Sequence, residues 1–324
     1  MTGFSERALN WWTPERTAKV TGGRRYRILP GPGAELLRCL GLLNSDATMS
    51  HDSVRKYVQV NHLLDLLAPR IEDLAARHKT IRIVDAGSGK AYLSLVLAWA
   101  LREIWSLKFE IHGVESNQTL AARAGELAVR LGFADTVRFS AAKIGDINFL
   151  DLFGRDSNND PFRPNLVVAL HACDTATDDA VAGAIAAKAD AIAVAPCCQA
   201  ELASLWKLRA GTRSAGADAP IHPMTPVFDA PEMRRALAAE ITDSYRMLLL
   251  RARGYEVTTT EFVSSFHTAK NRLILATRRG NYLEAARRQY EALKAHMGGD
   301  AISLEAKLAA TATEGSASTR PQTE

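Results

Sequence analysis

The sequence has few cysteines and no long hydrophobic run, and each absence excludes a class of protein. Four cysteines among 324 residues, two of them adjacent at Cys197 and Cys198, cannot build the disulfide framework of a small secreted domain. The most apolar stretches, 93–101 and 189–199, are far shorter than the roughly 20 residues that a membrane helix needs. The first residues contain no apolar segment of a secretory signal. We therefore expect a cytoplasmic protein without a membrane span.

A charge excess of one sign is also missing from most of the chain. The formal net charge is +4, and residues 1–60 carry nine basic and five acidic side chains, a difference of +4, so the rest is neutral overall. The excess lies in an N-terminal arm that mixes basic and aromatic residues: Trp11, Trp12, Arg16, Lys19, Arg24, Arg25, Tyr26 and Arg27. Such an arm is typical either of a nucleic-acid-binding surface or of a solvated extension with a few anchored aromatic residues.

Glycine, proline and apolar periodicity divide the chain into four parts. Closely spaced Gly and Pro residues predict irregular structure over 1–33, and apolar residues at helical spacing predict a helix over 53–77 with a break or kink at Pro69. Residues 209–231, rich in Gly, Ala and Pro, favour a loop or lid. The predicted parts are an N-terminal extension (1–52), a central domain (53–280), a C-terminal helix (281–298) and a disordered tail (299–324).

Between residues 81 and 197, short β-branched runs alternate with helical stretches rich in Ala and Leu. This alternation indicates βαβ units and a parallel sheet. The last two runs, 255–264 and 271–279, have no helix-length connection between them and therefore predict an antiparallel hairpin at one edge of the sheet. The predicted fold class is α/β: a Rossmann-like sheet, mostly parallel, with a C-terminal antiparallel hairpin and helices on both faces.

The strongest chemical signal is the segment IRIVDAGSGKAYLSLVLA, residues 81–98. A predicted strand ends at Asp85, then Gly87 and Gly89 let the backbone approach a ligand at the carboxyl end of that strand. Glu115 ends the next predicted strand, where an acidic residue accepts hydrogen bonds from ribose hydroxyls. A dinucleotide-binding dehydrogenase would carry a third glycine, and a P-loop protein a Lys-Ser or Lys-Thr pair. Neither feature is present at the required spacing.

An acidic residue followed by Gly-x-Gly resembles the first motif of class I S-adenosylmethionine (SAM) methyltransferases, with Ala91 where a third glycine is frequent. The terminal hairpin is also typical of that family. The resemblance implies that the loop holds the methionine part of SAM, that the next acidic residue holds the ribose, and that the segment after the third strand contacts adenine. The cofactor-binding residues predicted in this way are Asp85, Gly87, Ser88, Gly89, Glu115, Lys143, Ile144 and Leu170.

The segments ALHACDTATD and VAPCCQ, at the ends of the fourth and fifth predicted strands, carry a cluster of reactive side chains. Because both strand ends open on one crevice, His171, Cys173, Asp174, Cys197 and Cys198 should lie near the transferred methyl group. We predict His171, Asp174 and Cys197 as catalytic residues, with His171 or Asp174 orienting or deprotonating the acceptor. Three other interpretations stay open: a zinc site, a nucleophilic Cys197, and buried structural thiols beside a structural histidine.

Together with the late segment FVSSFHTAKNRLILA (262–276), these motifs resemble the methyltransferase-domain family of the methyltransferase-like 25 proteins and the glutathione-transferase C-terminal-domain-containing protein. The resemblance covers about residues 50–280 and departs from the family at Ala91 and Asp174, each in place of a familiar glycine. It implies a SAM-dependent methyltransferase, with RNA as the favoured acceptor, then protein, then small molecules. The alternative is a non-catalytic pseudo-enzyme that binds SAM or a partner protein.

Overall fold

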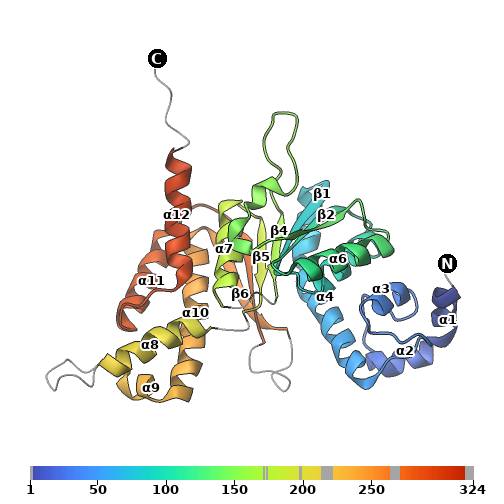
Figure 1. The fold of residues 1–324 in the computed structure, drawn as a ribbon, viewed down its shortest axis with the longest axis horizontal. Coiled ribbons are helices and arrows are strands. Elements are labelled where there is room, and N and C mark those ends of the chain that lie inside the picture. Colours follow the sequence, from blue (N-terminus) through green and yellow to red (C-terminus); the bar gives the residue numbers. More distant parts are fainter. Residues whose placement is uncertain are drawn as a thin grey trace.

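One seven-stranded sheet forms the centre of the molecule (Figure 1). A computed structural model describes residues 3–170, 172, 174–196, 199–212, 222–262 and 271–317. The strands are β1 (Thr80–Ala86), β2 (Lys108–Glu115), β3 (Val137–Ala141), β4 (Leu166–Ala169), β5 (Ala191–Val194), β6 (Tyr255–Glu261) and β7 (Arg272–Arg278). Their order is β3-β2-β1-β4-β5-β7-β6; β1 to β5 pair in parallel, and β7 is antiparallel to both of its neighbours. The predicted Rossmann-like sheet with a terminal antiparallel hairpin is confirmed.

Apolar cores cover both faces of the sheet, because successive side chains of a strand point to opposite faces. In β1, Ile81 and Ile83 belong to one core, while Val84 and Ala86 belong to the other. All residues of β4 and β5 are buried. Burial on both faces is typical of parallel strands flanked by helices. The carboxyl ends of β1, β2, β4 and β5 therefore supply the exposed edge on which a site can form.

The first core is covered mainly by α3 (Ala34–Cys39), α4 (His51–Arg77), α5 (Tyr92–Glu103) and α6 (Gln118–Arg130). Two short 3-10 helices, η1 (Ile144–Asp146) and η2 (Phe149–Asp151), lead from β3 toward β4. Helix α4 continues through Pro69, so of the predicted break or kink the break is wrong. The buried stripe of Leu64, Leu67 and Ile71 packs on both sides of the proline and holds the helix together. No described helix combines the length and the apolar character needed to cross a membrane.

Residues 3–21 form two helices, α1 (Gly3–Trp11) and α2 (Pro14–Thr21), where irregular structure was the expectation. The glycine and proline residues that suggested irregular structure lie at the ends of these helices. The Thr13 side chain accepts a hydrogen bond from the Arg16 N–H, Pro14 occupies the first turn, and Gly22 ends α2 with a φ of +59°. The prediction was wrong because glycine and proline here mark the ends of short helices. Helices α1 to α3 lie at one end of the molecule (Figure 1).

The other end of the molecule is helical as well, against two predictions (Figure 1). Helix α7 (Thr175–Ala186) packs on β4 and β5, and the helices beyond it are α8 (Ala200–Thr212), α9 (Thr225–Asp229), α10 (Pro231–Ala252), α11 (Glu284–His296) and α12 (Ser303–Ala317). Helices α8 and α9 occupy parts of the predicted loop, and α12 occupies most of the predicted disordered tail. At the start of α12, the Ser303 N–H donates to both carboxylate oxygens of Glu201 at 3.0 Å, and Leu304 and Leu308 are buried. Composition could not reveal these long-range contacts.

Candidate active site

The glycine loop between β1 and α5 folds back onto the second strand. The backbone N–H groups of Gly87 and Ser88 both donate to the Val114 carbonyl oxygen, at 2.8 and 3.0 Å. Gly87 and Gly89 adopt φ values of +79° and +54°, which residues with a side chain rarely do. A Cβ atom on Gly89 would meet no described atom within 4 Å. The loop therefore presents an open backbone face at the carboxyl end of the sheet.

Glu115, the last residue of β2, joins this loop to the start of α6. Its Oε2 accepts a hydrogen bond from the Gly89 N–H at 2.9 Å, while Oε1 accepts from the Asn117 N–H at 2.8 Å and the Ser116 hydroxyl at 3.3 Å. A carboxylate oxygen can accept two hydrogen bonds, so Oε2 has capacity for a ligand hydroxyl. The bonds to the two backbone N–H groups hold the carboxylate in place for that contact.

Asp85 is the buried acidic group of the site, with 2% of its surface exposed. Its Oδ2 accepts a hydrogen bond from the Ser94 hydroxyl at 2.5 Å, and no described basic side chain forms an ion pair with it. Burial raises the pKa of Asp85 to about 6, and the hydrogen bond from Ser94 opposes this rise. A buried carboxylate is costly unless a cation neutralises it. Asp85 is thus suited to bind a cationic group of a ligand.

Two residues that sequence reasoning missed, Ser94 and Gly113, shape the same region. Ser94 is the hydrogen-bond partner of Asp85, and Gly113 of β2 leaves room for the Phe139 ring, which would lie 2.3 Å from a Cβ atom at that position. The Ser88 Oγ atom, predicted as a cofactor contact, is buried and has no hydrogen-bond partner among the described residues. An unsatisfied buried hydroxyl beside an open loop fits a site that a ligand completes. A glycine close to the end of a buried strand was the only sequence signal for Gly113.

Lys143 and Ile144 begin the segment after β3, and both lie close to Glu115 in the fold. The Ala142 N–H donates to the Glu115 carbonyl oxygen at 3.0 Å, which places the start of this segment beside the end of β2. Lys143 precedes η1, and Ile144 is buried in the second core. Leu170 follows β4 and packs into the first core. The structure thus brings Lys143 and Ile144 to the predicted edge, while Leu170 contributes mainly to packing.

The end of β4 lies directly beside the glycine loop. A Cβ atom on Gly87 would be 3.5 Å from the Cβ of Ala172, so the two backbones approach closely. Ala172 belongs to the segment that also contains the predicted catalytic His171. His171, Cys173, Cys197 and Cys198 lie outside the described residues. Their catalytic, zinc-binding and structural interpretations stay predictions, and within the described ranges no group of three or more His, Cys, Asp or Glu residues is placed to hold a metal ion.

Asp174, the third predicted catalytic residue, is engaged at the start of α8. Its Oδ1 accepts hydrogen bonds from the N–H groups of Ala200 at 3.1 Å and Glu201 at 3.4 Å. A carboxylate in this place satisfies free N–H groups and complements the helix dipole. The backbone of Asp174 has φ +49° and ψ −116°, a conformation that favours glycine. The structure therefore ties the end of β4 to the helix after β5 through this carboxylate.

A buried arginine lies behind Asp174 and connects α7 with α10. Arg246 is almost fully buried, and its Nε donates to Asp178 Oδ1 at 2.7 Å, its Nη1 to Asp243 Oδ1 at 3.1 Å and its Nη2 to the Asp174 carbonyl oxygen at 3.2 Å. Arg272, at the start of β7, donates to the other oxygen of Asp243 at 3.0 Å. The charges of this cluster are therefore mutually compensated. We call Arg246, Asp178, Asp243 and Arg272 the buried charge cluster.

Gln199 extends the buried charge cluster toward the end of β5. Its Nε2 lies 3.4 Å from both carboxylate oxygens of Asp243 and 3.4 Å from the Pro196 carbonyl oxygen. Pro196 and Gln199 flank Cys197 and Cys198 in the sequence. The cluster thus contacts the segments on both sides of the predicted acceptor pocket. No sequence motif signalled it, because its members come from separate elements and share no spacing.

Comparison with known proteins bears directly on the glycine loop. Residues 55–205 match the model of a family described as a methyltransferase domain. The matched range contains β1 to β5, the glycine loop, Glu115 and Asp174. Residues 55–205 are therefore similar to a methyltransferase domain. No curated protein matches the chain.

Several solved structures are similar to the chain at low sequence identity. The SAH-bound Podospora anserina methyltransferase PaMTH1 is 11% identical, with 82% of this chain and 94% of that chain covered at a TM-score of 0.41. An rRNA methylase from Streptococcus thermophilus is 10% identical, with 70% and 97% covered at a TM-score of 0.38. A geranyl diphosphate methyltransferase in complex with GPP and sinefungin is 16% identical, with 86% and 100% covered at a TM-score of 0.40. Similarities of this size say nothing about the substrate of this chain.

Proposed function

We propose that this methyltransferase transfers the methyl group of SAM to RNA. The observation that carries the methyl-donor part is the open loop at Gly87–Gly89. On one side lies the buried Asp85, which forms no ion pair with a described residue, and on the other the spare acceptor position of Glu115. SAM combines a cationic amino group with ribose hydroxyls. A carboxylate without a cation and a carboxylate with free acceptor capacity match these two groups.

The residues of the loop would act by binding and orienting the donor. SAM supplies a methyl group on a sulfonium, which is already a good leaving group, so in-line alignment with the acceptor is the main requirement. Asp85 would bind the amino group, Glu115 the ribose hydroxyls, and the Ser88 hydroxyl would gain the partner that it lacks. Lys143 and Ile144 would border the adenine. The acceptor would enter at the ends of β4 and β5, where His171 or Cys197 would orient or deprotonate it.

RNA as the acceptor is supported by the N-terminal arm. Arg24 and Arg25 are exposed and take part in no ion pair among the described residues, and the Arg16 guanidinium lies 3.9 Å from the centre of the Trp11 ring. Exposed arginines beside aromatic rings bind phosphates and stack on bases. Arg27, by contrast, pairs with Asp65 at 2.7 Å and anchors the arm to α4. A protein acceptor would need no such concentration of basic and aromatic groups.

The methyl-donor site is tested by substituting Gly89. Gly89→Leu places a side chain in the open face of the loop, whereas Gly41→Leu places one at another exposed glycine with a similar φ of +68° and no described atom within 4 Å of its Cβ position. Both variants bear the same backbone strain, but only Gly89→Leu should abolish SAM binding in calorimetry. Equal SAM affinity of wild type and Gly89→Leu would refute the site.

The acceptor is tested with SAM carrying a labelled methyl group. The protein is incubated with an extract of cells that lack it, and the products are digested in parallel with ribonuclease and protease. Label released by ribonuclease supports RNA as the acceptor. Label released only by protease assigns the activity to proteins and overturns the RNA part of the proposal, while the SAM site stands or falls with the calorimetry.

A further inference from the structure

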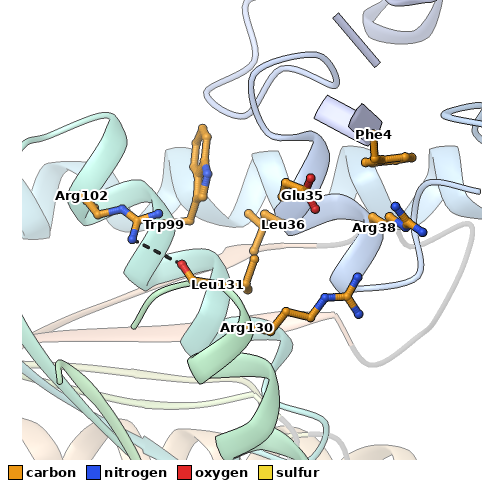
Figure 2. A pocket seen from close by; sticks show the side chains of 8 residues that line it. All are labelled: Phe4, Glu35, Leu36, Arg38, Trp99, Arg102, Arg130 and Leu131. Atoms are coloured by element: carbon orange, nitrogen blue, oxygen red, sulfur yellow. Dashed lines mark hydrogen bonds between the residues drawn. The ribbon is translucent and has the colours of Figure 1, made fainter. Parts of the chain in front are cut away.

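A hollow lies where the N-terminal helices meet the domain, away from the glycine loop. Figure 2 shows it between α1 and α3 on one side and the C-terminal ends of α5 and α6 on the other. Its volume is about 500 Å³. The side chains that matter for its chemistry are Phe4, Glu35, Arg38, Trp99, Arg102 and Arg130. We call this hollow the arginine cavity.

The arginine cavity is positively charged. Three arginines and one glutamate line it, so three minus one leaves a net charge of +2. Glu35 accepts a hydrogen bond from the Ser5 hydroxyl at 2.8 Å, and Arg102 donates to Glu103 at 2.6 Å and to the Leu131 carbonyl oxygen at 3.4 Å. These contacts hold Glu35 and Arg102 in place. The excess positive charge of the cavity therefore falls on Arg38 and Arg130.

Arg38 and Arg130 carry that excess. Neither forms a hydrogen bond or ion pair through its guanidinium group with another described residue; Arg38 lies over the Phe4 ring, 4.2 Å from its centre. In Figure 2 the two guanidinium groups point toward the same end of the cavity. Guanidinium groups are the preferred protein partners of phosphate, because their N–H donors match two phosphate oxygens. The half-buried Trp99 adds an aromatic surface on which a base can stack.

The cavity lies about one helix length from the glycine loop. Helices α5 and α6 begin near the glycine loop and Glu115, and their last turns line the cavity. A helix of 12 residues, such as α5, is about 18 Å long. One small molecule cannot bridge that distance, whereas a strand of several nucleotides can.

We propose that the arginine cavity binds a nucleotide unit of the RNA acceptor, with its phosphate on Arg38 and Arg130 and its base against Trp99. The cavity would hold the RNA at one point while another nucleotide of the same strand enters the crevice at the ends of β4 and β5. This inference rests on the proposed function, because it places a distant part of the same substrate. It also gives the N-terminal helices a role, since α1 and α3 complete the cavity.

Fluorescence anisotropy with a labelled single-stranded RNA of mixed sequence tests the cavity. The full chain is compared with Arg130→Glu and with Arg288→Glu, which makes the same charge change at an exposed position of α11, at the other end of the molecule (Figure 1). We expect Arg130→Glu to weaken RNA binding at least about tenfold and to reduce the slope of log affinity against log salt by about one or more. Arg288→Glu should change the affinity less than about twofold, and SAM affinity should not change in either variant.

Additional variants and controls distinguish a defect in the cavity from a wrong choice of acceptor and from a folding defect. Arg130→Gln removes the charge without placing an acidic group at the C-terminus of α6, and it should also weaken RNA binding. Equal RNA affinity of Arg130→Glu and Arg288→Glu would overturn the cavity, even if RNA carries the transferred label. RNA binding that depends on Arg130, together with label only on protein, would retain the cavity and overturn the acceptor. Competition by inorganic phosphate or a mononucleotide as strong as that by the RNA would reduce the site to a small-anion site and overturn the inference.

Discussion

Asp85 and Asp178 are both buried carboxylates near the same edge of the sheet, but their surroundings differ. Asp178 contacts the Arg246 guanidinium at 2.7 Å and also accepts a hydrogen bond from the Ser303 hydroxyl at 2.7 Å. Asp85 is hydrogen-bonded by the Ser94 hydroxyl and the Ser94 backbone, forms no ion pair with a described residue, and has a pKa that burial raises to about 6. The protein neutralises the carboxylate that holds helices together, whereas no described residue places a cation beside the other. We therefore expect Asp85 to be the carboxylate that a ligand uses.

The largest effect on stability should follow from removing Arg246, the cation that neutralises Asp178. Arg246→Met keeps most of the side-chain volume but leaves the buried Asp178 without a cation and Asp243 with Arg272 alone. We expect it to lower the free energy of unfolding by about 3–5 kcal/mol in urea titrations, because uncompensated buried charges are costly. Arg246→Lys keeps the positive charge and should lower the free energy of unfolding by less. A free energy of unfolding within about 1 kcal/mol of wild type for Arg246→Met would show that the buried charge cluster does not hold the acceptor side together.

Asp85→Asn should change stability in the opposite direction. A pKa raised from 3.8 to about 6 means that the folded chain binds this proton more tightly than the unfolded chain, so stability falls as the pH rises from about 4 to about 6. At about 1.4 kcal/mol per pH unit, the cost at pH 7 is at most about 3 kcal/mol. Asp85→Asn should recover part of it, and the gain should vanish below pH 4. Urea unfolding curves of wild type and Asp85→Asn at pH 4 and pH 7.5 measure the gain at neutral pH and its disappearance in acid.

The same substitution should weaken SAM binding at least about tenfold, because a charged hydrogen bond is lost. In the wild type, SAM affinity should fall as the pH drops below about 6, where Asp85 takes up its proton. Asp85→Asn should remove this pH dependence, which calorimetry at several pH values would show. An Asn variant that binds SAM as tightly as wild type would disprove the role of Asp85 in the donor site.

Asp174 offers a sharper test on the acceptor side, because its backbone favours glycine while its side chain caps α8. Asp174→Ala loses the cap and keeps the strain, so we expect a loss of about 1–2 kcal/mol. Asp174→Gly loses the cap but relieves the strain, and the two effects should largely cancel. Methyl transfer by a stable Asp174→Gly variant would show that Asp174 acts by capping. Abolished transfer with intact SAM binding would support the predicted catalytic role.

The smallest effect is expected at Ala91. This residue precedes α5 with a φ of +61°, a left-handed conformation that costs a non-glycine residue about 1 kcal/mol. Ala91→Gly relieves this strain but increases the entropy of the unfolded chain, so the free energy of unfolding should change by less than about 1 kcal/mol. SAM affinity should stay at the wild-type value, because the Ala91 side chain is buried away from the open face. A large change in SAM affinity would mean that the loop conformation depends on Ala91.

The conformation of the glycine loop and the place of Glu115 at the end of β2 could be predicted because their signals are local. Asp85, Gly87, Gly89 and Glu115 lie at the ends of two adjacent parallel strands, and a strand's end, a positive-φ glycine and a helix start are all visible in short segments. The errors arose where local composition was ambiguous. Residues 303–317 of the predicted disordered tail form α12, and residues 3–21 form two helices, because buried contacts with distant elements stabilise them.

The sequence by itself determined the α/β architecture, the glycine loop and the two acidic residues beside it. Hydrophobic periodicity and the backbone freedom of glycine are properties of short segments, and the alternation of strands and helices can be read along the chain. Only the tertiary structure decided that Asp174 caps α8 and that Arg246 joins Asp178 to Asp243. Ser303 reaches Asp178 across 125 positions of sequence. Such pairings depend on burial, since a charge needs a partner only once folding has removed it from water.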